Sequence, residues 1–432
     1  MLDIRLIRDH PEVVKKDLEK RKDQEKISLL NSLLKKDTEW RKTKQDLDNL
    51  RKKRNELSQK INELKKQKKT INAINDALKE VKEIPLKIKK LEEEETKLSL
   101  EIHSALLRIP NILHSSVPYG KDEKDNKVVR KWGKIPSFRF SLKAHGELAE
   151  DLGIADFKKA SQVSGTGFYY FRNELALLNM ALMNFAIDFL TKKGYKLVIP
   201  PLMLRRKPYE GVTDLKDFED VMYKIENEDL YLIATSEHPI AALLMNETIN
   251  EKDLPLKLIG MSPCFRKEIG SHGVDTRGFY RVHQFWKIEQ FIFCKPEDSW
   301  KYHEELQKNS EELYKKLKIS FRVVNICTGD IGIVASKKYD IEAWFPRQKS
   351  YGEVGSNSNC TDYQARRLNI KYIDKKGNKS YAHTLNNTAV ATSRAIVAIL
   401  ENYQLKDGSV KIPLVLQPYM NGLKKIPKSK AF

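Results

Sequence analysis

The first 110 residues contain no glycine and one aromatic residue, Trp40. They carry 29 Lys and Arg against 21 Asp and Glu, a composition typical of long solvated helices. Apolar residues recur at alternating spacings of three and four, which places them on one narrow helix face. The first run comprises Leu47, Leu50, Leu57, Ile61 and Leu64, and the second comprises Ile74, Leu78, Val81, Ile88, Leu91, Leu98 and Ile102. We therefore expect residues 1–110 to form a helical arm containing an antiparallel coiled-coil hairpin.

The turn of this hairpin is expected at residues 65–76, "KKQKKTINAIND", where the first apolar run ends. A first helix from about residue 38 to 70 would be about 50 Å long, so it should project into solvent. Pro85 should kink or interrupt the returning helix. A charge-laced coiled coil is often a dimerisation or spacer element. The excess of eight basic residues (29 − 21) and the basic turn instead favour contact with phosphate.

Residues 111–135 are rich in proline, glycine, aspartate and asparagine, and we expect a linker with one short extended segment. Residues 136–432 are expected to be the second domain. Amphipathic helices are predicted over 174–195, ended by Gly194, and over 299–318. Strands are predicted at 196–201, 230–235, 256–265, 284–294 and 321–329. Strands joined by long loops, with helices in blocks, indicate an α+β fold with a mainly antiparallel sheet.

The formal charge of +20 and the pI of about 9.4 favour a polyanionic partner such as a nucleic acid. A basic protein without such a partner is an equal alternative on charge alone. The four cysteines form no C-x-x-C pair, so buried free thiols are expected and zinc is not. The chain has no apolar run of about 18 residues and no signal-peptide core. We expect a cytoplasmic protein outside any membrane.

Charged residues occupy two predicted strands within the segment 265–290, "FRKEIGSHGVDTRGFYRVHQFWKIEQ". Three pairs would each share a strand face through i, i+2 spacing: Arg266 with Glu268, Arg281 with His283, and Lys287 with Glu289. Joined by a loop at 269–279, they would form a hairpin with one charged face, which is most often a solvated edge. The interleaved apolar residues instead indicate a buried sheet, where charges need partners or ligands: Phe265, Val282, Phe285 and Trp286. This favours a functional site, although the chain has neither a P-loop nor a dinucleotide-binding glycine motif.

This segment resembles the second signature motif of class II aminoacyl-tRNA synthetases, in its seryl-tRNA synthetase form. The segment 192–203, "KKGYKLVIPPLM", resembles the first motif, with Pro201 as its proline, and 383–404, "HTLNNTAVATSRAIVAILENYQ", resembles the third. "TSEHP" (235–239) and "YGEVGSNSNCTDYQARR" (351–367) resemble the serine loop and the ATP-contacting strand. The resemblance covers essentially the whole chain, arm included. It implies an antiparallel-sheet class II catalytic domain behind a tRNA-binding arm.

The resemblance also implies an activity. Such an enzyme activates L-serine with ATP to seryl-adenylate and transfers serine to the 3′-terminal adenosine of tRNA(Ser). Members also charge tRNA(Sec) where that tRNA exists. The enzyme works as a homodimer, with the first motif and Pro201 at the interface.

Individual residues take roles from the same resemblance. Arg266 suits the α-phosphate and the attacking carboxylate, since its planar fork binds oxyanions through two parallel hydrogen bonds. Arg394 would hold the γ-phosphate end of ATP, and Phe285 would stack on adenine. The implied ATP site comprises Arg266, Lys267, Glu268, Val282, Phe285, Glu353, Val354, Gly355, Ser356 and Arg394. The implied serine site comprises Thr235, Ser236, Glu237, Arg266, Glu289, Asn386 and Thr388.

Glu353 and Ser356 offer the hard oxygen ligands that Mg²⁺ prefers. Arg266 and Arg394 are the two expected catalytic residues, because this chemistry needs charge stabilisation and no general base.

Two other functions fit parts of the same sequence. A related ligase could charge a carrier protein with a small amino acid, but such ligases generally lack the arm. A non-catalytic coiled-coil protein that binds nucleic acid would not need Arg266, Glu289, Glu353 and Arg394, all of which are present.

Overall fold

The computed structural model describes residues 1–66, 71–215, 219–268 and 278–428. These residues form two compact units, Met1–Pro110 and Asn111–Phe432. The expected loop 269–279 lies almost wholly outside the described residues, as does part of the arm's turn.

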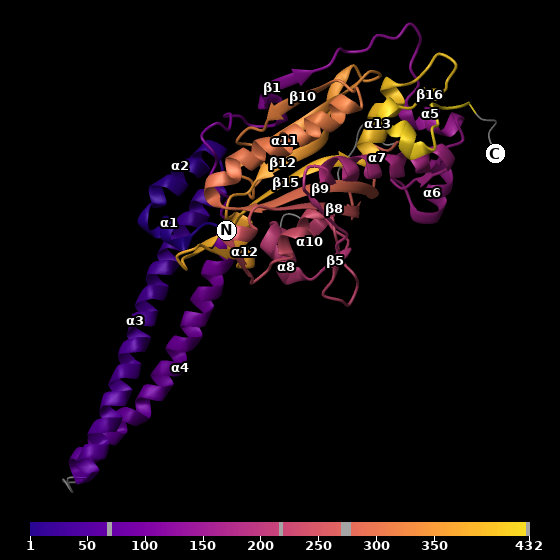
Figure 1. The fold of residues 1–432 in the computed structure, drawn as a ribbon. Coiled ribbons are helices and arrows are strands. Elements are labelled where there is room, and N and C mark those ends of the chain that lie inside the picture. Colours follow the sequence, from indigo (N-terminus) through magenta and orange to yellow (C-terminus); the bar gives the residue numbers. More distant parts are fainter. Residues whose placement is uncertain (67–70, 216–218, 269–277, 429–432) are drawn as a thin grey trace. The chain divides into compact units, whose positions relative to one another are not determined.

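Four helices make up the first unit: α1 (Ile4–Asp9), α2 (Pro11–Arg21), α3 (Gln24–Lys66) and α4 (Ile71–Arg108) (Figure 1). Asp3 caps α1 by accepting a hydrogen bond from the Arg5 amide, and a proline begins α2 where its missing N–H costs nothing. The Arg8 guanidinium binds both carboxylate oxygens of Asp37, at 2.9 and 2.6 Å, which ties α1 to α3.

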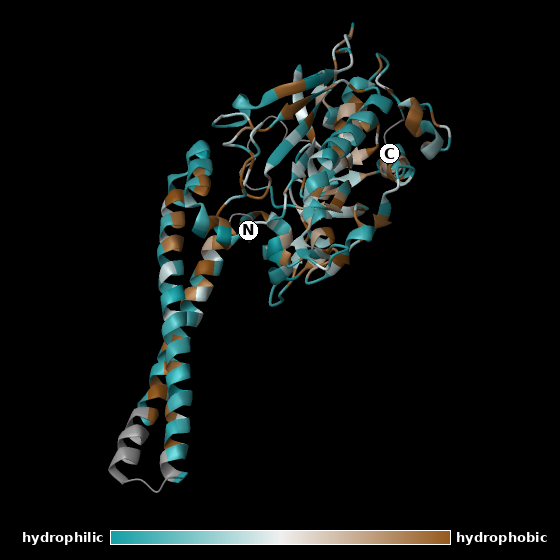
Figure 2. Ribbon diagram, turned by 60° about the vertical axis from the view of Figure 1, so that its left-hand side comes forward, coloured by the Kyte–Doolittle hydropathy of each residue, from teal (hydrophilic) through white to brown (hydrophobic). Residues whose placement is uncertain are grey.

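Helices α3 and α4 confirm the antiparallel coiled-coil hairpin. The Trp40 indole donates to Glu95 at 2.8 Å, and Lys36 pairs with Glu101 at 2.9 Å. The earlier residue of α3 thus pairs with the later residue of α4, as in an antiparallel hairpin. Brown apolar residues alternate with teal polar ones along both helices (Figure 2). The buried seam is formed by Leu47, Ile84 and Ile88, flanked by Leu50, Leu57 and Leu91.

Two details of the arm differ from the prediction. Helix α3 begins at Gln24, after only two residues beyond the end of α2 and well before the expected residue 38. Helix α4 is not interrupted at Pro85 and continues to Arg108. The polar segment before residue 38 therefore joins the long helix, because Leu30 and Leu33 bury their side chains there. The predicted seam side chains of Leu64, Ile74 and Leu78 lie outside the described part.

An eight-stranded sheet organises the second unit, in the order β1-β10-β11-β12-β15-β9-β8-β4. All its neighbouring strands pair antiparallel except β4 and β8, which are parallel. The α+β class with a mainly antiparallel sheet is confirmed. The strands are β1 (Lys127–Trp132), β4 (Lys196–Val198), β8 (Leu256–Phe265), β9 (Gln284–Cys294), β10 (Phe321–Asn325), β11 (Lys337–Phe345), β12 (Ser350–Asn359) and β15 (His383–Ala391).

Smaller elements surround this sheet. The helices are α5 (His145–Asp151), α6 (Phe157–Ser164), α7 (Asn173–Thr191), α8 (Arg206–Val212), α10 (Glu237–Ala242), α11 (Ser299–Lys316), α12 (Tyr363–Leu368) and α13 (Thr392–Asn402), with 3₁₀ turns η1 (Glu123–Asp125), η2 (Glu219–Val221), η3 (Glu251–Asp253), η4 (Pro296–Asp298) and η5 (Leu414–Met420). The short strands are β2 (Ala155–Asp156), β3 (Tyr170–Phe171), β5 (Met203–Leu204), β6 (Tyr231–Leu232), β7 (Thr248–Asn250), β13 (Lys371–Ile373), β14 (Lys379–Tyr381), β16 (Val410–Lys411) and β17 (Lys425–Ile426).

The two faces of the sheet carry different layers. Apolar residues of α7, α11 and α13 share one large core with Ile288, Ile292 and Ile341 of the strands. A smaller core joins α8, α10 and α12 to Phe291 and Phe293 of β9. Because strand side chains alternate between faces, even-numbered residues of β9 face the large helices and odd-numbered ones face the opposite side. Glu289 therefore lies on the face opposite α11.

Helix α7 matches the predicted amphipathic helix. Within the described ranges it is the one helix that is long and apolar enough to span a membrane by length and composition, but half of its apolar window is buried in the protein. Such burial is what a core helix shows, and one helix of this kind is weak evidence for a membrane span.

Residues 111–135 are not the linker that we expected. Their strand β1 pairs with β10 and becomes an edge of the main sheet. The amide of Asn111 donates to the carbonyls of Val334 and Cys360 at 3.0 and 2.9 Å. The segment therefore belongs to the second unit, and its expected short extended segment is an edge strand of the main sheet.

The charged hairpin also needs a correction. Strands β8 and β9 have the predicted bounds, so Arg266 and Glu268 follow β8, and Arg281 precedes β9. One further hydrogen bond, from the Arg266 amide to the His283 carbonyl at 2.9 Å, extends the pairing beyond the strand ends. Glu268 has a φ of +45°, which ends any extended alternation. Only Lys287 and Glu289 share a strand face as predicted.

Candidate active site

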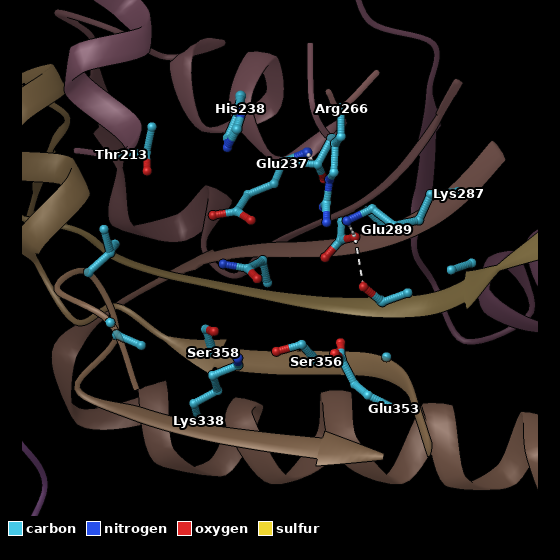
Figure 3. Close-up of a pocket in the computed structure, with 18 of the residues that line it drawn as sticks. Thr213, Glu237, His238, Arg266, Lys287, Glu289, Lys338, Glu353, Ser356 and Ser358 are labelled. Atoms are coloured by element: carbon cyan, nitrogen blue, oxygen red, sulfur yellow. Dashed lines mark hydrogen bonds and ion pairs between the residues drawn. The ribbon is translucent and has the colours of Figure 1, made fainter. Parts of the chain in front are cut away.

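A cavity of about 550 Å³ lies in the second unit, over strands β9, β12 and β15 (Figure 3). Fourteen of the predicted site residues line it: Thr235, Glu237, Arg266, Glu268, Val282, Phe285, Glu289, Glu353, Val354, Gly355, Ser356, Asn386, Thr388 and Arg394. In Figure 3, Glu237 and Arg266 reach in from one side, and Glu353 and Ser356 face them from the other. The fold thus gathers residues that are more than 150 positions apart in the chain (394 − 235 = 159).

Three predicted residues lie elsewhere. Ser236 is fully buried behind the cavity wall, against the backbone of Gly260, where an added Cβ would come within 2.4 Å of its hydroxyl. The Lys267 amide donates to the Val221 carbonyl at 2.9 Å, and its side chain is not part of the cavity lining. Pro201 is exposed just beyond edge strand β4. None of the three lines the cavity, although Ser236 and Lys267 adjoin residues that do.

One end of the cavity holds a pair of acids and a lysine. The Lys287 ammonium lies 2.5 Å from Glu289 Oε2, and the Thr388 hydroxyl donates to the same oxygen at 3.2 Å. The other oxygen, Oε1, is buried and has no hydrogen-bond partner among the described residues. The second acid, Glu237, accepts a hydrogen bond from Gln364 at 3.1 Å. Burial, and then the nearby charge of Glu289, raise the pKa of Glu237 to about 7.

Arg266 lies in the middle of the cavity. Its Nε donates to the Ala234 carbonyl at 3.3 Å, and its guanidinium lies over the Phe285 ring, 5.4 Å from the ring centroid. These two contacts fix the direction of the planar fork and leave its terminal nitrogens toward the cavity. Phe285, expected to stack on adenine, therefore already carries a cation over its ring.

The opposite end of the cavity is organised by Arg394. Its Nη1 lies 3.1 Å from both the carbonyl and the carboxylate of Glu353, and its guanidinium lies over the Tyr280 ring at 5.0 Å. The Tyr280 hydroxyl donates to the Glu353 carbonyl at 3.0 Å. Burial opposes ionisation of Glu353, but the charges of Arg394 and Lys338 outweigh it and lower its pKa to about 2. Glu353 is therefore a carboxylate at neutral pH.

Glu353 and Ser356 could together hold a hard cation, since an ionised carboxylate and a hydroxyl from one strand both face the cavity. Among the described residues, no group of three or more His, Cys, Asp or Glu side chains is placed to hold a metal ion. The donor set at this point is thus a small one, of the kind that Mg²⁺ shares with substrate phosphates. All four cysteines are free and buried, as predicted.

Sequence reasoning missed several lining residues. Tyr280 and Lys338 contact or face the predicted acids, and two loops add Val212–Asp214 and Ile331–Ala335. Lys338 could have been found, because "KKYDIEAW" alternates charged and apolar residues as a half-buried strand does. The loops carry no such period, so only the folded chain reveals them.

Comparison with known proteins agrees with this geometry. Residues 221–403 match the family described as the tRNA synthetase class II core domain (G, H, P, S and T). The fold of the second unit is thus that of a class II aminoacyl-tRNA synthetase. Residues 1–113 match the seryl-tRNA synthetase N-terminal domain.

Full-length relatives narrow this class to one family. A serine–tRNA ligase of Methanocella arvoryzae is 56% identical over 98% of this chain and 99% of its own length. The seryl-tRNA synthetase of Pyrococcus horikoshii, solved in complex with ATP, is 50% identical, covers 100% of both chains and has a TM-score of 0.94. A cytoplasmic serine–tRNA ligase of Naegleria fowleri in complex with AMP is 37% identical, with 99% and 98% coverage and a TM-score of 0.88. The chain belongs to the seryl-tRNA synthetase family.

Proposed function

We propose that this chain activates L-serine with ATP and then charges tRNA(Ser) with it. The observation that carries the proposal is the cavity itself, which brings Arg266 together with the acids Glu237 and Glu289 and with the Arg394–Glu353 pair. The carboxylates suit a substrate with an ammonium group at one end, and the two arginines suit phosphates at the other end.

The chemistry requires no general base. The serine carboxylate is ionised at neutral pH, so its oxygen attacks the α-phosphorus of ATP, and pyrophosphate leaves with the electron pair of the broken P–O bond. The terminal hydroxyl of the tRNA then attacks the seryl carbonyl, the bond from that carbonyl to the adenylate oxygen breaks, and AMP leaves while its phosphate takes up the hydroxyl proton. Arg266 stabilises charge on the pentavalent phosphorus, because its fork is already fixed before the substrates arrive.

The nucleotide site combines side chains and backbone. In this proposal Arg394 binds the γ-phosphate end, and the ring of Phe285 stacks on the adenine. Glu268, Lys267 and the backbone at Val282 border the base, and Val354 and Gly355 form the floor under the phosphates. Glu353 and Ser356 would hold Mg²⁺, which on binding would neutralise phosphate charge.

Serine recognition depends on polar contacts more than on size. A pocket that hydrogen-bonds the substrate hydroxyl rejects an analogue lacking that group by about 10⁴ to 10⁵, since the buried polar groups would lose their partner. Glu289 and Thr388 are the candidates for the hydroxyl, Glu237 and Thr235 for the amino group, and Asn386 closes the pocket. Ser236 supports this wall from behind.

In this proposal the arm binds tRNA, and the edge of the sheet near Pro201 binds a second copy of the chain. The coiled-coil hairpin would contact the phosphates of tRNA(Ser), and of tRNA(Sec) where one exists, by shape more than by sequence. Exposed apolar residues near Pro201 would form a homodimer interface. Four buried free thiols fit a reducing compartment such as the cytoplasm.

ATP–pyrophosphate exchange measured with each amino acid, followed by acylation of total tRNA, tests the proposal. Exchange should depend on serine, and tRNA should accept the serine. Exchange without tRNA charging would favour a ligase acting on a carrier protein. No serine-dependent exchange at all would overturn the activation step and leave a binding protein.

A further inference from the structure

We propose that Lys287 is a positioning residue for serine selection, which acts by holding one oxygen of Glu289 and leaving the other for the substrate. The inference rests on the proposed function and refines its serine site. Lys287 and Glu289 are two residues apart on β9, so both side chains lie on the cavity face of the sheet. No direct contact of Lys287 with substrate is needed.

The two oxygens of Glu289 have unequal surroundings. Oε2 receives the Lys287 ammonium at 2.5 Å and the Thr388 hydroxyl at 3.2 Å. Oε1 is buried and has no hydrogen-bond partner among the described residues. A buried carboxylate oxygen without a donor is costly. The carboxylate is therefore held through one oxygen in an orientation that offers the other to an incoming O–H donor.

The polar and charged groups around the Lys287–Glu289 pair come from three neighbouring elements. Glu237 and His238 approach from the start of α10, Arg266 from the end of β8, and the neutral Thr388 from β15. Burial keeps His238 uncharged by lowering its pKa to about 3, so two carboxylates face two cations. Removing Lys287 would leave Glu237 and Glu289 with Arg266 as their shared counter-charge.

The Lys287 side chain is 7% exposed and its ammonium contacts Glu289, itself 1% exposed. A buried ammonium needs a fixed anionic partner, so the pair forms one rigid unit. Rotation of the Glu289 carboxylate would move its free oxygen away from the serine hydroxyl. An effect of this kind falls on the binding and selection of serine more than on the use of ATP.

Lys287→Met and Lys287→Arg test the proposal in the full-length protein by ATP–pyrophosphate exchange. Lys287→Met should raise the serine KM on the order of 10- to 100-fold, lower the preference for serine over alanine, and leave the ATP KM within about twofold. Lys287→Arg should recover part of the selectivity, because a guanidinium can still reach the carboxylate. Lys257→Met is the matched control, because Lys257 of β8 forms a 2.7 Å pair with Glu305 of α11, outside the cavity lining.

A double variant separates positioning from a merely structural effect. If Lys287 acts through Glu289, Lys287→Met should add little to the loss caused by Glu289→Gln. Additive losses, or a raised ATP KM with an unchanged serine KM, would overturn the proposal. An unchanged ATP KM also shows that each variant is folded. Absence of serine-dependent exchange in the unaltered chain would instead refute the proposed function, so the two failures are distinguishable.

Discussion

At the residue scale, the two acids at the proposed serine end of the cavity, Glu237 and Glu289, have different surroundings. Glu289 is paired with an ammonium, whereas Glu237 accepts one hydrogen bond from the neutral amide of Gln364. Burial and the charge of Glu289 raise the pKa of Glu237 to about 7, and Lys287 and Arg266 oppose the rise. Glu237 thus changes charge within the physiological range, and its carboxylate is the form that binds an ammonium.

This titration predicts a pH-dependent serine KM. Because the pKa is raised, the carboxylate is lost as pH falls below about 7. The ionised fraction rises from about 0.1 at pH 6 to about 0.9 at pH 8, so the serine KM should fall about 10-fold over that interval. Exchange kinetics at saturating ATP measure it.

Glu237→Gln supplies the control, since its amide does not titrate. That variant should have a serine KM about 10- to 100-fold higher at pH 8 and a much flatter pH profile. A profile in the variant as steep as in the unaltered chain would show that another group is responsible.

At the element scale, successive side chains of β9 and β15 point to opposite faces of the sheet, one toward α11 and the other toward the cavity. Gln290 of β9 and Asn387 of β15 point away from the cavity and donate to the Leu306 carbonyl of α11 at 3.4 and 2.6 Å. Their neighbours Glu289 and Thr388 point into the cavity. The polar residues on one face of these strands hold the sheet on α11, and those on the other face would contact substrate in the proposed function.

The arm is a second element with a separable purpose. Deleting residues 45–91 and joining Lys44 to Glu92 through a short glycine-rich turn should abolish tRNA charging and leave serine-dependent exchange within about twofold. The cut keeps the Trp40–Glu95 and Lys36–Glu101 contacts, so the base of the hairpin stays paired. Exchange and charging measured on one preparation give the comparison. Equal loss of both activities would contradict the proposed division between arm and cavity.

At the scale of the whole molecule, one edge of the main sheet exposes apolar side chains. Leu177 and Met180 of α7, with Leu197 of β4 and the adjoining Ile199, are between 43% and 71% exposed. Helix α7 and strand β4 contact one another, so these residues gather near Pro201. Contiguous exposed apolar surface is typical of a protein interface. This supports the proposed homodimer.

Ile199→Asp should therefore convert a dimer to monomers, because it would place a charge within an apolar interface. Sedimentation equilibrium measures the change, and thermal unfolding checks the fold of the monomer. Val163→Asp is the control, since Val163 of α6 is also exposed, at 63%, and lies on another element. A monomeric unaltered chain, or a dimer that tolerates Ile199→Asp, would contradict this interface.

The sequence by itself determined what local periodicity can specify. Alternating spacings of three and four predicted the coiled coil, and the apolar runs predicted the exact bounds of β8 and β9. Both patterns are local, because the side chains that a helix or strand buries recur every few residues. Motif resemblance named fourteen of the residues that line the cavity. It did not place Lys267 or Ser236 outside the lining, nor the ends of the charged hairpin.

Only the tertiary structure decided which distant residues meet. The register of β15 on β9 sets Thr388 opposite Glu289, and that of β11 on β12 sets Lys338 opposite Ser358. Strand β1 lies in the segment expected to be a linker. Its place in the sheet depends on hydrogen bonding to β10 more than on its own residue pattern, because only one of its edges is paired. Pairing of this kind depends on contacts far apart in the chain, so the free oxygen of Glu289, and with it the part assigned to Lys287, was visible only after folding.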